Sequence, residues 1–229
     1  MAEATIQIIQ RADKGEHVFI TGMTGSGKSE LARFLLGAGG YKRVIVQDGK
    51  HEFTAPKEWG EKNKDYGVTN DMYKVDELFK KHGRVIWRPD VEDLEDQANW
   101  HRLDSLYDFI YEQGNMVFYD DEASMSSTAT KYPKVKKRLL KQGRSKGISV
   151  WNITQAPVGV PNDFMREASH AFIFYLNAET DRDKVAKNYG DRIKRMKEKD
   201  EAFLEYMFYY SSTKNRGDLV KFNPIPYNG

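Results

Sequence analysis

Short runs of apolar residues alternate along the chain with segments in which apolar residues recur every three or four positions. The runs are apolar throughout, as in strands covered on both faces. They predict strands at residues 17–21, 43–47, 84–88, 116–120, 148–153 and 171–176. The intervening spacing predicts helices at 29–36, ending at Gly37, and at 98–113, 134–142, 163–169 and 181–188. This alternation indicates an α/β fold with a mostly parallel central sheet.

The remaining segments do not suggest a second domain. We expect a late, aromatic-rich strand at 201–211, an extended tail at 222–229, and a mobile insertion at 52–76, which carries glycines and many charges. The 229 residues fit one domain. We therefore predict a single domain over 1–229, with its core at about 15–182 and C-terminal strand and tail elements at 183–229.

Composition excludes several classes of protein. The chain has no cysteine, which rules out disulfide frameworks, zinc–thiolate sites and thiol nucleophiles. Its apolar runs are far shorter than the roughly 18 residues of a membrane span, so we expect no transmembrane segment of its own. The net charge is only +2, so any contact with a polyanion must come from local clusters of basic residues.

One loop has the pattern of a phosphate-binding site. The sequence Gly22-Met-Thr-Gly-Ser-Gly-Lys-Ser29 matches G-x-x-x-x-G-K-[ST] between a predicted strand and a predicted helix. Glycines let backbone N–H groups approach phosphate oxygens at a helix N-terminus. Lys28 would reach the β- and γ-phosphates, and the Ser29 hydroxyl would join the shell of a Mg²⁺ ion. The expected nucleotide-binding residues are Gly22, Thr24, Gly25, Ser26, Gly27, Lys28, Ser29 and Glu30.

The strand at 116–120 ends in the three acids Asp120, Asp121 and Glu122. Clustered carboxylates repel one another unless a cation lies among them, and nucleotide-bound Mg²⁺ would be that cation. We expect Asp121 to bind the metal and Glu122 to polarise the attacking water. The register is open by one residue, so Asp120 is the alternative acid on the metal side.

A second strand tip is polar. The strand at 148–153 runs on into Thr154 and Gln155. In a parallel sheet the carboxyl ends of the strands face the ligand. Gln155 would therefore contact both the γ-phosphate and the attacking water, since an amide both donates and accepts hydrogen bonds. The simpler alternative is an amide that only ends a strand.

Taken in order, these motifs resemble the HerA–FtsK superfamily of DNA-pumping P-loop ATPases. Besides the phosphate loop, the matching elements are Val46–Phe53, with an Asp and a Gly-Glu-aromatic element, Asp121–Ala123, and Gly143–Pro157, which runs from Gly-Arg-x-x-Gly-Ile to Thr-Gln-x-Pro. Arg166, Asn177 and Asp181 fit the downstream pattern. The resemblance covers about 17–182 and implies a RecA/ASCE-like P-loop NTPase with a three-layer sandwich.

The resemblance also implies a function. The family forms rings, commonly hexamers, with nucleotide between subunits and DNA through the centre. A chain that is nearly the bare motor is similar to the genome-packaging ATPases of internal-membrane, double-jelly-roll viruses. This implies ATP and Mg²⁺ as cofactors, sequence-independent double-stranded DNA as substrate, and a capsid vertex or viral membrane protein as partner. The protein would then work at the virion packaging vertex or in the cytoplasm of the infected cell.

Two basic features fit a ring motor. Arg144, in the Gly-Arg motif, is the best candidate for an arginine finger supplied to the neighbouring subunit, with Arg138, Arg166 and Arg182 as alternatives. The segment 131–146 contains eight basic residues and no acid. Such a run favours contact with the phosphate backbone. The expected DNA contacts are Lys134, Lys136, Lys137, Arg138 and Lys141.

Two other functions remain open on sequence grounds. A P-loop phosphotransferase acting on a small metabolite would be active without DNA and would need an acceptor. A nucleotide-dependent assembly switch would bind tightly, turn over negligibly, and change its oligomeric state with nucleotide.

Overall fold

The computed structural model describes residues 15–197, 206–213 and 220–222. These residues form one sheet of nine strands in the order β3-β4-β2-β5-β6-β1-β7-β8-β9. All neighbours from β3 to β7 are parallel, whereas β8 and β9 are added antiparallel at one edge. The strands are β1 (Val18–Thr21), β2 (Val44–Gln47), β3 (Gly67–Thr69), β4 (Arg84–Trp87), β5 (Met116–Asp120), β6 (Ile148–Thr154), β7 (His170–Ile173), β8 (Phe208–Ser212) and β9 (Val220–Phe222).

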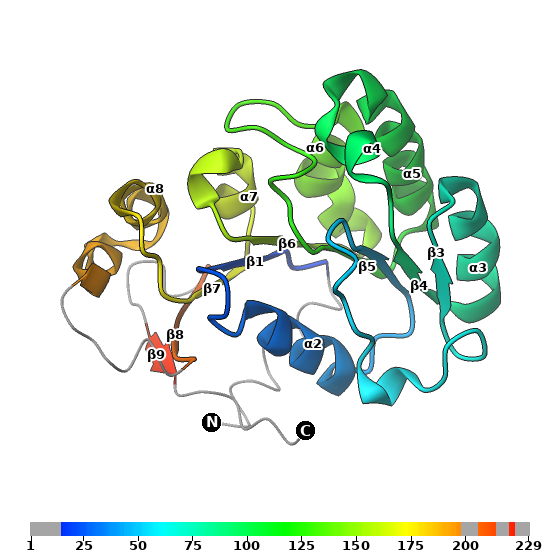
Figure 1. The fold of residues 1–229 in the computed structure, drawn as a ribbon, viewed down its shortest axis with the longest axis horizontal. Helices are drawn as coiled ribbons and strands as arrows, with labels where there is room; N and C mark the ends of the chain where they lie inside the picture. The colour runs from blue at the N-terminus through cyan, green and yellow to red at the C-terminus, as the bar shows by residue number, and fades with distance from the viewer. Residues whose placement is uncertain (1–14, 198–205, 214–219, 223–229) are drawn as a thin grey trace.

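Helices cover both faces of the sheet, giving three layers (Figure 1). One face carries α2, and the other carries α3, α5 and α6. The helices of the described residues are α2 (Lys28–Ala38), α3 (Val75–His82), α4 (Val91–Glu95), α5 (Trp100–Gln113), α6 (Lys134–Gln142), α7 (Asn162–Arg166) and α8 (Glu179–Tyr189). The predicted α/β fold with a mostly parallel sheet is confirmed.

Strand side chains alternate between two apolar clusters. On β1, Phe19 belongs to the cluster under α3, α5, α6, α7 and α8, while Val18 and Ile20 belong to the cluster under α2. All four residues of β1 and of β2 are buried, because both faces are covered. The central strands are therefore rigid supports for the loops that follow them.

The largest difference from the sequence prediction is at 52–76. We expected a mobile insertion, but the segment forms a 3₁₀ turn around the buried Trp59 and then β3, which pairs with β4. Strand β3 is only three residues long, with Val68 as its one apolar side chain, so its pattern is too short to signal a strand. The helices α3 and α4 were likewise not predicted. The expectation for 201–211 is met in part, since β8 begins at Phe208 while 201–205 lie outside the described residues, as does 223–229.

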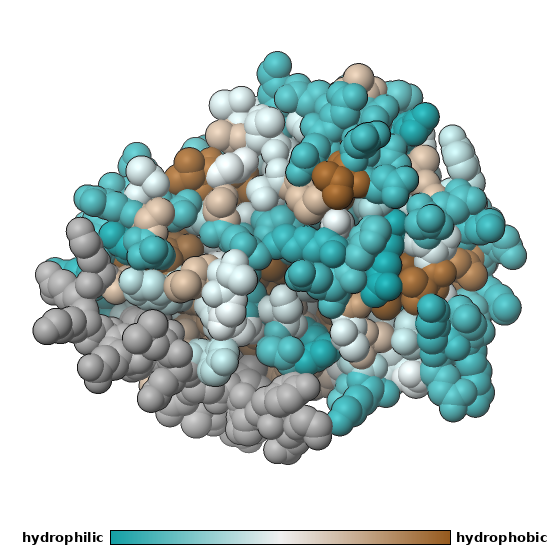
Figure 2. Space-filling view, in the orientation of Figure 1, coloured by the Kyte–Doolittle hydropathy of each residue, from teal (hydrophilic) through white to brown (hydrophobic). Residues whose placement is uncertain are grey.

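Gly37 does not end its helix. α2 continues to Ala38, and Gly37 lies inside it against Pro56 and Glu58. A Cβ atom at Gly37 would lie 3.1 Å from the Pro56 Cβ, so this glycine permits close packing of the segment before the 3₁₀ turn. The surface seen in Figure 2 is mainly hydrophilic, with separate apolar patches. Within the described residues, no helix has both the length and the apolar character needed to cross a membrane.

Candidate nucleotide-binding site

The loop between β1 and α2 has the backbone of a phosphate cradle. Gly22, Gly25 and Gly27 have φ angles of 155°, 75° and 97°, which side-chain-bearing residues rarely adopt. Gly27 is the N-cap of α2, so the first N–H groups of the helix face the loop. The Ser26 hydroxyl is buried and has no hydrogen-bond partner among the described residues. The loop therefore offers a buried, unpaired hydroxyl at a helix N-terminus, an arrangement that a phosphate group would satisfy.

The Lys28 ammonium folds back across this loop. Its Nζ donates a 2.8 Å hydrogen bond to the carbonyl oxygen of Met23, and the residue is only 6% exposed. Burial lowers the pKa of Lys28 to about 8, while the nearby Glu122 carboxylate raises it and Lys50 lowers it further. Lys28 is thus a weakly solvated cation that an incoming anion would stabilise.

Gln155 reaches the same loop from the end of β6. The Thr24 hydroxyl donates a 2.8 Å hydrogen bond to Gln155 Oε1. Since β6 pairs in parallel with β1, the tip of β6 and the phosphate loop leave the sheet at the same edge. The structure therefore brings Gln155 beside the phosphate loop, where the sequence interpretation expected it.

Glu122 lies just past β5 with both carboxylate oxygens occupied. Oε2 pairs with the Lys50 ammonium at 2.7 Å, and Oε1 accepts from the Ser124 hydroxyl at 2.6 Å and from the Gln155 N–H at 3.3 Å. The residue is 6% exposed. Glu122 is therefore an almost fully buried carboxylate that is held in place by the Lys50 ammonium and by the polar end of β6.

Asp121, unlike Asp120 and Glu122, lines a hollow of about 110 Å³, and it shares that lining with Ser29, Glu30, Arg33 and Glu52. Burial raises the pKa of Asp121 to about 6, although the Tyr119 hydroxyl donates a 2.7 Å hydrogen bond to it. A cation would stabilise the ionised form of this carboxylate. Asp121 and Ser29, both oxygen donors, thus meet where the sequence interpretation expected Mg²⁺, and the donor set fits that ion.

Asp120 is a different kind of residue. It is 1% exposed and forms a fully buried ion pair with Lys136 of α6. The Ser126 hydroxyl and the Gln47 amide also donate to its carboxylate, each at 3.2 Å. Its carboxylate is buried against Lys136, and Asp120 does not line the hollow that Asp121 shares with Ser29. Asp121 therefore stays our prediction for the acid on the metal side, ahead of the alternative Asp120.

The same ion pair removes Lys136 from the expected DNA contacts, because its side chain is completely buried. Arg138 stacks 3.5 Å from the Tyr111 ring centroid and pairs with Asp108. Lys141 pairs with Glu167, and this partner raises the pKa of Lys141. One face of α6 thus packs into the core while the other lies at the surface. The number of basic residues in the segment does not show which of them lie on which face. Lys134, Lys137, Arg138 and Lys141 are exposed on α6, so these four remain DNA-contact predictions.

Arg144 lies far from the phosphate loop of its own chain. It precedes β6, at the amino edge of the sheet, where its guanidinium donates a 2.6 Å hydrogen bond to the Ser169 hydroxyl. Arg166 is exposed. Arg182, by contrast, is 2% exposed and donates to the carbonyl oxygen of Leu176 at 2.9 Å, which excludes it as a finger for a neighbour. Arg144 therefore cannot act on its own nucleotide site.

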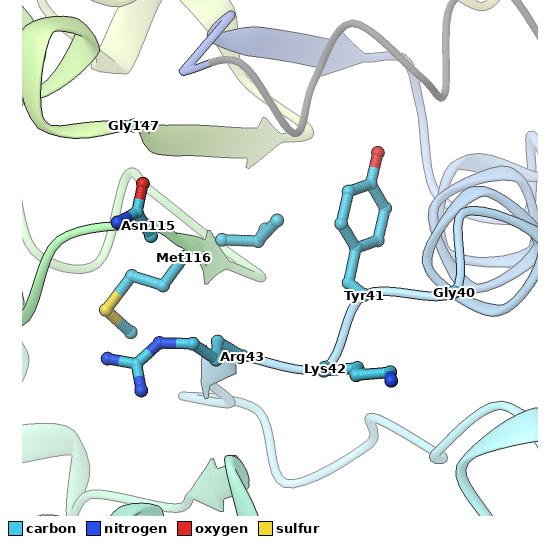
Figure 3. A pocket seen from close by; sticks show the side chains of 8 residues that line it. Gly40, Tyr41, Lys42, Arg43, Asn115, Met116 and Gly147 are labelled. Atoms are coloured by element: carbon cyan, nitrogen blue, oxygen red, sulfur yellow. The ribbon is translucent and has the colours of Figure 1, made fainter.

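Lys50 and Glu52 were not among the predicted site residues. Both follow β2, which pairs in parallel with β5, so they leave the sheet at the edge that carries Glu122. The strand order was the missing information, since the sequence alone did not make β2 the neighbour of β5. Another hollow, of about 380 Å³, lies at the opposite edge and is lined in part by Lys42, Arg43 and Asn115 (Figure 3). It contains none of the predicted nucleotide-site residues.

Comparison with known proteins places this site in a familiar fold. No family model and no curated protein matches the sequence. Among solved structures, the genome packaging NTPase B204 from Sulfolobus turreted icosahedral virus 2, in complex with ATP-γS, matches with a TM-score of 0.68 and 15% identity. That match covers 93% of this chain and 99% of B204. B204 from Sulfolobus turreted icosahedral virus, described as a DNA-packaging ATPase, matches with a TM-score of 0.63 and 18% identity over 93% and 98% of the two chains.

A longer neighbour gives the same result. The conjugation coupling protein TcpA of pCW3, in its monomer form with ATPγS, matches with a TM-score of 0.55 and 17% identity. The match covers 92% of this chain and 60% of TcpA. Because these identities are low, the likeness concerns the fold. The predicted resemblance is confirmed at that level: the chain has the fold of the P-loop ATPases that include viral genome-packaging enzymes.

Proposed function

We propose that the protein is a Mg²⁺-dependent ATPase that drives double-stranded DNA, most specifically a viral genome-packaging motor. The observation that carries this proposal is the convergence of Lys28, Glu122 and Gln155 at one edge of the sheet, around a glycine loop with an unpaired buried hydroxyl. The similarity of fold to packaging NTPases supports the choice of a motor over other P-loop enzymes.

Each group has a role in hydrolysis. The loop N–H groups and Lys28 would bind the phosphates, and Ser29 and Asp121 would hold a Mg²⁺ ion, whose charge would offset that of the β- and γ-phosphates. Gln155 orients the attacking water. Glu122 takes its proton while the water oxygen bonds to the γ-phosphorus. The bond from that phosphorus to the β–γ bridging oxygen breaks, and ADP leaves with the electron pair.

The motor assembly is part of the same proposal. We expect self-association into a ring, commonly a hexamer, in which Arg144 reaches the neighbour's nucleotide from the amino edge. Lys134 and Lys137 are exposed cations at the start of α6 that suit contact with phosphate backbone. A capsid vertex or viral membrane protein would dock the ring at the packaging vertex, or the ring would assemble in the cytoplasm of the infected cell. The single-domain organisation over 1–229 belongs to this proposal too.

The test is ATP turnover of the wild type and of Glu122→Gln, with and without double-stranded DNA, at low and high salt. We expect stimulation by DNA of any sequence that fades as salt rises, and no turnover in Glu122→Gln. Turnover that needs a small-molecule acceptor and ignores DNA would favour a phosphotransferase. Tight nucleotide binding with negligible turnover, and an oligomeric state set by nucleotide, would favour an assembly switch.

A further inference from the structure

Lys50 is a second cation beside the expected position of the γ-phosphate. Its ammonium lies 2.7 Å from Glu122 Oε2, and its side chain is 27% exposed. Its charge also influences the groups on the other side of the site, since it lowers the pKa of Lys28 and that of Asp121. Lys50 is therefore close to the phosphate lysine, the metal-side acid and the water-activating acid together.

The backbone around Lys50 is fixed. Arg88 Nε donates a 2.9 Å hydrogen bond to the buried Asp48 carboxylate, which also accepts from the Glu52 N–H at 3.0 Å. On the other side, the His51 ring bonds the carbonyl oxygen of Pro89 at 2.8 Å. Only the side chain of Lys50 is left to move, and its four-carbon stem can carry the ammonium over a few ångströms without a change in the fold.

The contact with Lys50 competes with the function of the Glu122 carboxylate as a base. Ser124 and the Gln155 N–H already occupy Oε1, and Lys50 occupies Oε2. A general base must present a lone pair to the water that it deprotonates, and the Lys50 ammonium takes one of the lone pairs of Oε2, the less occupied oxygen. Movement of Lys50 to another anion nearby would therefore open Oε2 fully to that water.

We propose that Lys50 is a cis-acting phosphate ligand, which exchanges the Glu122 carboxylate for the γ-phosphate of bound ATP. The γ-phosphate carries more negative charge than one carboxylate, so it attracts the ammonium more strongly. The exchange frees Glu122 to accept the proton and places a cation on the charge that develops during phosphoryl transfer. ADP has no γ-phosphate and leaves Lys50 on Glu122. This inference rests on the proposed ATPase function and assigns a further catalytic residue to it.

The binding test compares ADP with a non-hydrolysable ATP analogue, both with Mg²⁺, by isothermal titration. In Lys50→Met, the preference for the analogue over ADP should fall about tenfold relative to the wild type, while the ADP affinity stays within about twofold. Lys57→Met, which removes an exposed lysine of the neighbouring 3₁₀ turn, is the matched control and should keep the wild-type preference. Lys50→Arg keeps the charge and should restore most of the preference. A thermal melt of each variant checks that it is folded.

The kinetic test measures turnover of the same variants. Lys50→Met should lower kcat at least tenfold. An unchanged preference together with unchanged or faster turnover would overturn the inference, because Lys50 would then only restrain Glu122. If the wild type binds both nucleotides but does not hydrolyse ATP, the proposed enzyme function fails, while a lost preference in Lys50→Met would still support the phosphate contact. A wild type that binds neither nucleotide would overturn both.

Discussion

Lys136 of α6 and Asp120 of β5 form an ion pair in which both side chains are at most 1% exposed. Removing one partner from such a pair leaves an unpaired buried charge, which typically costs about 3–5 kcal/mol. We expect Lys136→Met to lower the free energy of unfolding by about that amount in urea denaturation. Lys137→Met, at the next and exposed position, should change it by less than about 0.5 kcal/mol. Equal effects of the two changes would contradict the buried pair.

In DNA binding, the exposed Lys137 should matter. Lys137→Met should weaken binding to DNA of every sequence. It should also lower the slope of log affinity against log salt concentration by about one, which corresponds to the loss of one phosphate contact. Binding measured by fluorescence anisotropy at several salt concentrations checks this. Unaltered affinity and slope would exclude Lys137 as a backbone contact.

Replacing Asp121 or Asp120 by asparagine should change the free energy of unfolding in opposite directions. The pKa of Asp121 is about 6 when folded and 3.8 in a model peptide, so the folded protein binds the proton more tightly and loses stability as pH rises from about 4 to about 6. Asp121→Asn removes that loss and should gain up to about 3 kcal/mol over the wild type at pH 7.5, and much less at pH 4.5. Asp120→Asn should instead be destabilised at pH 7.5. Urea unfolding at the two pH values measures these changes. If the free energy of unfolding of Asp121→Asn depended on pH as that of the wild type does, the result would contradict the raised pKa.

The sequence was informative wherever the chemistry is local. The phosphate loop, the acids after β5 and the polar end of β6 are each contiguous, and their placement at one edge follows from parallel strands. The sequence could not show the roles of residues whose partners are distant along the chain. Lys136 looks like any other lysine of a basic helix until Asp120 is known to lie beneath it. Lys50 acquires meaning only when β2 is known to neighbour β5.

The edge of the sheet was the least predictable part of the fold for a related reason. β3 is three residues long and polar at one end, and its identity as a strand depends on pairing with β4 rather than on its own pattern. The glycines and charges of 52–76 suggested mobility, yet Trp59 and Phe53 bury the segment against the core. Two buried aromatic residues spaced six apart were the available signal.

Gln155 should affect hydrolysis more than binding. Its amide contacts Thr24 and its N–H contacts Glu122, so it connects the phosphate loop to the base without belonging to the cradle. We expect Gln155→Leu to lower kcat about tenfold to hundredfold, with nucleotide affinity within about threefold of the wild type, since only water orientation is lost. Thr24→Val, which removes the hydroxyl contact alone, should have a smaller effect. Loss of nucleotide binding in Gln155→Leu would show instead that the residue holds the loop together.

His17 should make the fold sensitive to acid. Its Nδ1 accepts a 3.0 Å hydrogen bond from the Val150 N–H while Nε2 donates to the carbonyl oxygen of Leu140, and burial lowers the pKa of His17 to about 4. The folded state therefore favours the neutral ring. Its contribution is complete above about pH 6.5 and is lost as pH falls towards 4, by about 3 kcal/mol in all. Following the imidazole resonances of the folded protein by NMR checks this, and titration near 6.5 would contradict the acceptor role of Nδ1.

Arg144 and Lys28 should complement each other between subunits. Arg144 lies at the amino edge of the sheet and Lys28 at the carboxyl edge, so one nucleotide cannot contact both within a chain. Arg144→Ala should lower turnover at least hundredfold, as the loss of an arginine finger does. Rings mixed from inactive Arg144→Ala and inactive Lys28→Ala subunits should regain measurable ATP turnover, because some interfaces then combine an intact cradle with an intact finger. Mixtures of Lys28→Ala with Glu122→Gln are the control and should stay inactive, since both changes damage the same half of the site. Inactive Arg144→Ala and Lys28→Ala mixtures would contradict the assignment of Arg144 to the neighbour's site.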